Sequence, residues 1–79
     1  MNIGKTLQEA RIKKGFTQTH VAMAMGYSTP QFISLIERGK SNIPPNKIKK
    51  ICKLLGLNPF RIALTIVDNF ENEMLEAIK

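Results

Sequence analysis

The sequence predicts an all-α fold of five helices, and three observations support this prediction. Apolar residues recur at spacings of three and four along most of the chain, which is the period of an amphipathic helix. Asn, Thr or Pro stands where such a segment begins, and Gly stands where most of them end. No run of alternating β-branched residues between hairpin turns predicts a β-strand, and the chain has neither an internal repeat nor a low-complexity segment.

The first helix is expected to run from Asn2 or Thr6 to Lys14. Asn2 is one possible N-cap, and Thr6 with Glu9 forms a capping-box alternative. Its inward positions carry three apolar residues: Ile3, Leu7 and Ala10. Gly15 closes the helix, and the chain then turns toward the second helix.

Residues 17–39 are the most informative segment, because they predict two short helices joined by a fixed turn. Thr17 is expected to cap the first of these helices, and Phe16 before it enters the core. The buried side of this helix is expected to hold Val21, Ala22 and Met25. Gly26 ends it, since the residue after a helix often adopts a left-handed conformation that glycine takes without steric cost. The methyl side chain of Ala22 allows the two helices to cross closely.

The second short helix follows two polar residues and a proline. Ser28 and Thr29 offer an N-cap, and Pro30 suits the first helical position because its missing N–H would have no helical partner there. Ile33 and Ile36 are expected to point inward at i, i+3 spacing. The outward face then carries Gln31, Ser34, Leu35 and Arg38.

The fourth helix is expected to start at Pro45 or Asn46, after a loop at residues 40–44, because the successive prolines Pro44 and Pro45 disfavour helix before Pro45. Its inward positions carry Ile48, Ile51, Cys52 and Leu55. Its lysine side chains are expected to face mostly solvent: Lys47, Lys49, Lys50 and Lys53. Gly56 ends the helix.

The last helix is expected to begin with Asn58 as N-cap and Pro59 at its first position, and to continue to about Ile78. It is longer than a small core needs, and its apolar sector extends beyond what four short helices could cover. The residues of this apolar stripe are Phe60, Leu64, Val67, Phe70, Met74, Leu75 and Ile78. A second copy of the chain is the simplest cover, and a bend at Asp68-Asn69 that returns the helix to its own domain is the alternative.

The charge of the chain is divided unevenly. Residues 1–58 hold ten Lys and Arg against two acids, a balance of +8, whereas residues 59–79 hold two against four, a balance of −2. A basic front half attracts a polyanion and releases condensed counterions on binding. The alternative is that the lysines only solvate exposed helix faces. We favour nucleic acid for the asymmetry as a whole.

Composition also excludes several classes. One His, one Cys and six acids do not form a convincing catalytic set, and no glycine-rich phosphate loop follows a strand, so neither an enzyme nor a cofactor is expected. His20 has no second ligand at metal-binding spacing. The single cysteine, Cys52, excludes an intrachain disulfide and fits a reducing cytoplasm. No apolar run suits a membrane span or a signal peptide, and we expect an intracellular protein without a membrane partner.

Six residues at fixed spacing resemble the lambda-repressor/Cro-like (XRE-type) helix-turn-helix family of bacterial and phage transcription regulators. They are Thr17, Gln18, Ala22, Gly26, Glu37 and Gly39. The resemblance covers roughly Asn2 to Phe60, and it implies a lambda-repressor-like domain at 1–58. The apolar stripe predicts that residues 59–79 form a C-terminal dimerisation helix. One departure is a turn that is longer by one residue, at Tyr27-Ser28-Thr29. This leaves open the angle at which the second short helix enters a DNA groove.

Together with the composition and the apolar stripe, the resemblance predicts a cytoplasmic, sequence-specific regulator of double-stranded DNA, most simply a repressor that binds a palindromic operator as a homodimer. Its recognition helix would be Pro30 to Arg38. The residues expected at base edges are Gln31, Ser34, Leu35 and Arg38. Those expected at phosphates are Thr17, Gln18, Tyr27, Thr29, Lys40, Ser41, Asn42 and Lys47. Arg11 and Glu37 match positions that form a structural ion pair in the family.

Two alternatives remain open. In the first, the C-terminal helix binds a different protein, as in an antitoxin that covers a toxin and represses its own promoter. In the second, the basic face binds RNA. The second is weaker, because RNA recognition commonly uses aromatic platforms, and the four Phe and one Tyr stand mostly at predicted core positions.

Overall fold

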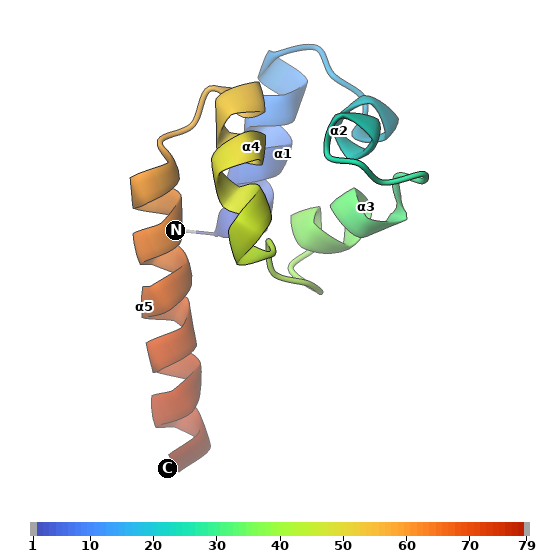
Figure 1. The fold of residues 1–79 in the computed structure, drawn as a ribbon. Coiled ribbons are helices and arrows are strands. Elements are labelled where there is room, and N and C mark those ends of the chain that lie inside the picture. Colours follow the sequence, from blue (N-terminus) through green and yellow to red (C-terminus); the bar gives the residue numbers. More distant parts are fainter. Residues whose placement is uncertain (1, 79) are drawn as a thin grey trace.

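A computed structural model describes residues 2–78, which form five helices and no strand (Figure 1). Four helices form a compact unit, in which α4 packs against α1, and α3 packs against both α1 and α2. The helix bounds are α1, Ile3–Lys13; α2, Gln18–Ala24; α3, Gln31–Glu37; α4, Pro45–Leu55; and α5, Pro59–Ile78. The predicted all-α fold of five helices is therefore confirmed.

Two asparagines cap helices where the sequence indicates. Asn2 Oδ1 accepts a hydrogen bond from the backbone N–H of Lys5 at 3.1 Å, so α1 begins here. The alternative start at Thr6 is wrong, since the Thr6 N–H already donates to the Asn2 carbonyl within the helix. Asn58 Oδ1 accepts from the N–H groups of Phe60 and Arg61, and Pro59 is the first residue of α5.

The start of α3 differs from the prediction by one residue. Pro30 precedes the helix instead of opening it, although its φ of −76° and ψ of −3° are already helical. Its carbonyl accepts the N–H of Ser34 at 3.0 Å, while no side chain caps the helix. The expected capping role of Ser28 or Thr29 is therefore wrong. The proline ring itself holds φ near the helical value at this position.

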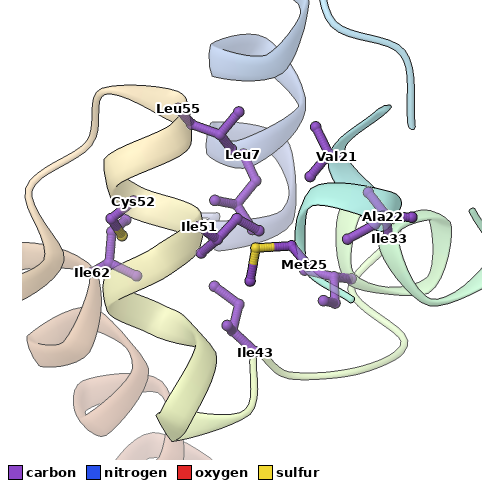
Figure 2. Packing of buried hydrophobic residues seen from close by; sticks show 11 residues of the cluster. Leu7, Val21, Ala22, Met25, Ile33, Ile43, Ile51, Cys52, Leu55 and Ile62 are labelled. Carbon is purple, nitrogen blue, oxygen red and sulfur yellow. The ribbon is translucent and has the colours of Figure 1, made fainter. Parts of the chain in front are cut away.

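The core joins all five helices and the connection between α3 and α4 (Figure 2). It consists of Leu7, Val21, Ala22, Met25, Ile33, Ile36, Ile43, Ile51, Cys52, Leu55 and Ile62. Two of these were not predicted: Ile43 lies in the connection, and Ile62 packs near Cys52 at the start of α5. Four residues expected in the core, Ile3, Ala10, Phe16 and Ile48, are only half-buried against it.

Gly4 allows α1 to approach α3 at very short range. A Cβ atom at this position would lie 2.6 Å from the carbonyl oxygen of Ile36 and 2.5 Å from that of Glu37. Both are backbone atoms at the end of α3, and they cannot move away as a flexible side chain could. A residue without a side chain therefore sets the distance between these two helices.

The last helix is continuous and projects from the rest of the molecule (Figure 1). The described chain measures 41 Å along its longest axis and 23 and 21 Å across it. Ile62 is buried, but every residue from Val67 to Ile78 is exposed. The expected bend at Asp68-Asn69 is absent, so this alternative is wrong and the apolar stripe is left uncovered by its own chain.

Candidate nucleic-acid interface

Helices α2 and α3 are joined by a turn whose backbone is fixed at several points. Gly26 has a φ of +90°, which ends α2 in a conformation that residues with a side chain rarely adopt. The N–H of Tyr27 then donates to the carbonyl of Ala22 at 2.9 Å. Val21, Ala22 and Met25 face the core as predicted, and α2 packs directly on α3.

The outer surface of α3 carries the four residues predicted to meet base edges. Ile33 and Ile36 are buried as expected, with 3% of each accessible surface exposed. Gln31 and Arg38 are exposed, whereas Ser34 and Leu35 are half-buried. Arg38 Nε lies 3.4 Å from the carbonyl oxygen of Ser34, so the guanidinium folds back along its own helix.

A polar cluster holds the end of α3 against α1 and α2. Arg11 Nε donates to Glu37 Oε2 at 2.7 Å, and Arg11 Nη2 donates to Oε1 at 3.1 Å. Gln18 Nε2 also donates to Glu37 Oε1 at 3.1 Å. Arg11 Nη1 donates to the carbonyl of Phe16 at 2.8 Å. One carboxylate at the end of α3 is thereby bonded to the first two helices.

The residues predicted to bind phosphate lie in four places around α3. Thr17 caps α2 and is exposed; its hydroxyl oxygen accepts the N–H of His20 at 3.0 Å. Gln18, in the first turn of α2, is half-buried in the cluster with Glu37. Thr29 is exposed in the turn before α3. In the connection after α3, Lys40 and Asn42 are exposed and Ser41 is half-buried.

Lys47 and Tyr27 make contacts that sequence reasoning missed. The side chain of Lys47 was expected to face solvent on α4. It is half-buried instead, and its Nζ donates to the carbonyl of Met25 at 2.9 Å. The same nitrogen lies 5.5 Å from the centre of the Tyr27 ring, which is 5.0 Å from the ring of Phe32. Lys47 lies three residues before Lys50 and six before Lys53, both exposed, and this spacing gives no sequence signal of such a contact.

The remaining candidate groups do not form a chemical site. His20 is exposed and stacks on Phe16, with ring centres 4.4 Å apart. Cys52 is fully buried, and this burial raises the pKa of its thiol. Within residues 2–78, no group of three His, Cys, Asp or Glu side chains is arranged to hold a metal ion.

Comparison with known proteins identifies the family. A family model described as helix-turn-helix matches residues 7–62, which span α1 to the start of α5. The chain belongs to the XRE-type helix-turn-helix family. No curated protein sequence matches it.

Two crystal structures share the helix-turn-helix fold of this chain. The restriction-modification controller protein C.AhdI from Aeromonas hydrophila is 28% identical, with a TM-score of 0.67 over 77% of this chain and 91% of that one. The clp gene regulator ClgR from Corynebacterium glutamicum is 23% identical, with a TM-score of 0.68 over 98% of this chain and 85% of that one.

Family and geometry agree on the general activity. The helix-turn-helix protein is a DNA-binding transcription regulator and not an enzyme. None of the helices within residues 2–78 has the length and apolar character needed to cross a bilayer.

Proposed function

We propose that the protein is a sequence-specific repressor, which binds a palindromic operator as a homodimer and inserts α3 into the major groove. The observation that carries the proposal is the fixed orientation of α3. Its inner face is held by Ile33 and Ile36, and its last residue, Glu37, is bonded to Arg11 and Gln18. A helix held at both its face and its end can present the same side chains to each site it meets.

Base readout is assigned to the outer face of α3, with Gln31 as the principal residue. The exposed Gln31 amide has the donor and acceptor needed to pair with adenine through two hydrogen bonds. Ser34 offers a hydroxyl, Leu35 offers an apolar contact to a thymine methyl group, and Arg38 can turn outward from Ser34 to a base or phosphate.

Contacts with the DNA backbone are assigned to polar groups on either side of α3. They include hydroxyls, amides and one ammonium group, which would orient the protein on DNA without reading its sequence. The residues are Thr17, Gln18, Tyr27, Thr29, Lys40, Ser41 and Asn42. The +8 balance of residues 1–58 would add a salt-dependent attraction that is independent of sequence.

Dimerisation is assigned to the apolar stripe of α5. Its seven side chains are each at least 50% exposed, and Phe60 and Ile78 reach 71% and 77%. A stable interface buries about 800 Å² on each partner, which one face of a 20-residue helix can supply. A groove of about 520 Å³ runs beside the stripe, between Ile3, Ile43 and Ile66. It gives a second copy an apolar surface on the body of the domain as well as on α5.

Residues 1–58 would then bind DNA and residues 59–79 would join the two copies, although Ile62 also completes the core. A two-fold dimer would place the two α3 helices about 34–36 Å apart, one turn of DNA. Control of transcription fits the likeness to C.AhdI, which is a restriction-modification controller protein. Such a regulator would act in the cytoplasm of a bacterium, encoded by the bacterium or a phage, and would join the nucleoid when bound.

The same exposed stripe favours a second function, in which α5 binds a different protein. The protein would then resemble an antitoxin that covers a toxin and represses its own promoter. This function predicts that the purified chain is a monomer with an exposed stripe. It also predicts a stable complex with the product of a neighbouring gene.

Selection from a random pool of duplex DNA tests the proposal directly. The purified chain is incubated with the pool at near-physiological salt, and bound molecules are amplified and sequenced over several rounds. We expect a palindrome whose half-sites lie about one turn apart. Enrichment of a single half-site would overturn the dimer, and a folded chain that enriches no sequence would overturn specific recognition and favour the partner-binding function.

A further inference from the structure

The strongest unexplained contact in the molecule joins the start of α4 to the turn before α3. Lys47 Nζ donates to the Met25 carbonyl at 2.9 Å and lies 5.5 Å from the centre of the Tyr27 ring. The Tyr27 ring contacts that of Phe32, in the first turn of α3, at 5.0 Å. We name Lys47, Tyr27 and Phe32 the turn cluster. We propose that it sets the orientation of α3, and that Lys47 is a positioning residue for base recognition.

The end of α2 supplies the acceptor for this lysine. Met25 follows α2 as its C-cap, and carbonyl groups at the C-terminus of a helix lack partners within the helix and carry partial negative charge. A half-buried ammonium group satisfies such a carbonyl and is stabilised by it. The same group lies within about 6 Å of an aromatic ring, the range at which a cation is attracted to the π face.

The contact between the Tyr27 and Phe32 rings connects the position of Lys47 to α3. Tyr27 lies in the lengthened turn, and its N–H is bonded to the Ala22 carbonyl, so its backbone is tied to α2. Its ring rests between the Lys47 ammonium group and Phe32. Phe32 directly follows Gln31 in α3, so a shift of the helix backbone at Phe32 would also displace the Gln31 amide. Base contacts tolerate displacements of only about 0.5 Å.

This role differs from the phosphate contact that the sequence suggests for Lys47. A lysine that only neutralises phosphate weakens binding to every sequence alike and contributes about one unit to the salt slope. A lysine that positions α3 changes which bases are preferred. The lysine Lys49, on the same helix, is exposed and provides a control of equal charge.

The free protein gives the first test. Tyr27 is the one tyrosine of the sequence and there is no tryptophan, so tyrosine emission reports this ring alone. We expect Lys47→Met to increase quenching of Tyr27 by acrylamide, because the variant loses the hydrogen bond to the Met25 carbonyl that ties α4 to the turn. Lys49→Met and Lys47→Arg should both match the unchanged protein. Equal quenching in Lys47→Met and Lys49→Met would overturn the proposal.

The DNA test rests on the proposed base readout by α3 and compares affinity for the selected site with that for its single-base variants. Lys47→Met should lose roughly tenfold in discrimination at one or more positions, while keeping the salt slope of Lys49→Met. A uniform loss of affinity with a shallower slope, or no change at all, would overturn the positioning role.

A second variant covers the case in which Lys47→Met does not fold, as judged by its thermal unfolding. Phe32→Leu removes a ring of the turn cluster without changing charge, and it should alter base preference at an unchanged salt slope. Unaltered preference would count against the turn cluster. If the unchanged protein selects no sequence, the proposed base readout fails, and the quenching of Tyr27 still decides whether Lys47 holds the turn cluster together.

Discussion

Arg11 and Glu37 join α1 to the last residue of α3 through two hydrogen bonds, of 2.7 and 3.1 Å. Their side chains are only 12% and 3% exposed, so water competes little for either charge. Gln18 satisfies Glu37 further, and the Phe16 carbonyl occupies another donor of Arg11. The pair therefore stabilises the packing of the domain and also holds α3 in its position.

Replacing Arg11 with Ala should destabilise the domain strongly. The Glu37 carboxylate would remain nearly buried without its cation, and breaking a buried pair from one side costs about 3–5 kcal/mol. Unfolding by urea, followed by circular dichroism, measures this loss. Arg61→Ala removes an exposed cation and serves as the control. If both variants unfold at the same urea concentration, the pair contributes nothing to stability.

The double variant separates charge from packing. Changing Glu37 to Gln in the Arg11→Ala background removes the unpaired charge and should recover part of the lost free energy of unfolding. A weakened DNA affinity in Arg11→Ala must be compared with its folded fraction, because unfolding alone would lower it.

Gly4→Ala should loosen the contact between α1 and α3. The added Cβ would lie 2.5 and 2.6 Å from two backbone carbonyl oxygens, so the helices must separate, at a cost of about 1–3 kcal/mol. Thermal unfolding should show this loss even though Ala is the better helix former. Lys5→Ala, at the exposed neighbouring position, is the control. An unchanged or higher melting temperature for Gly4→Ala would show that the contact adapts without cost.

Helix positions were predictable because the local signals agree with the global fold. Asn2, Thr17 and Asn58 each bond to an N–H of the helix that they cap, and apolar periodicity identifies most of the core. The predictions failed where contacts between distant parts of the chain determine which residues are buried. Ile43 is buried in a connection without any period, and the close approach at Gly4 depends on a helix more than 30 residues away along the chain.

The candidate site was predictable in part. Two pattern positions, Arg11 and Glu37, are joined in the structure, and Ile33 and Ile36 define which face of α3 points outward. Lys47 was misjudged as mostly external, because helical spacing groups it with exposed lysines. Its contact with Met25 arises only when the start of α4 lies beside the end of α2.

Cys52 should resist thiol reagents in the folded protein. The thiol is fully buried and its pKa is raised by that burial, so the reactive thiolate is scarce at neutral pH. Reaction with a colorimetric disulfide reagent should be slow in buffer and fast in guanidinium chloride. Rapid reaction with one thiol per folded chain would contradict the burial.

The same pKa predicts how stability depends on pH. A thiol whose pKa is higher in the folded chain than in the unfolded chain favours folding below the unfolded value of about 8.5. That contribution is lost as pH rises through the folded pKa. The free energy of unfolding should therefore fall less in Cys52→Ala than in the unchanged protein when both are moved to alkaline pH.

Substitutions at two residues should affect the base preference and the overall affinity of DNA binding differently. Gln31→Ala should weaken the best site by roughly 1–3 kcal/mol and relax preference at one base pair. Lys40→Ala should weaken all sequences alike and make the salt slope shallower by about one. Competition binding over a range of salt concentrations measures both quantities. If Gln31→Ala keeps its base preference, the principal contact belongs to another residue of α3.

Two charges placed in the apolar stripe should separate the dimer. Met74 and Leu75 are 50% and 59% exposed on α5, and changing both to Asp would bury unpaired carboxylates in an otherwise apolar interface. Sedimentation equilibrium should give the mass of one chain. Arg61→Gln with Asn72→Asp makes the same change of net charge on exposed positions of the same helix outside the stripe, and this control should remain a dimer. A dimeric mass for the Met74 and Leu75 variant would mean that another surface joins the copies, whereas a monomeric mass for the unchanged protein would favour a different protein as the partner of α5.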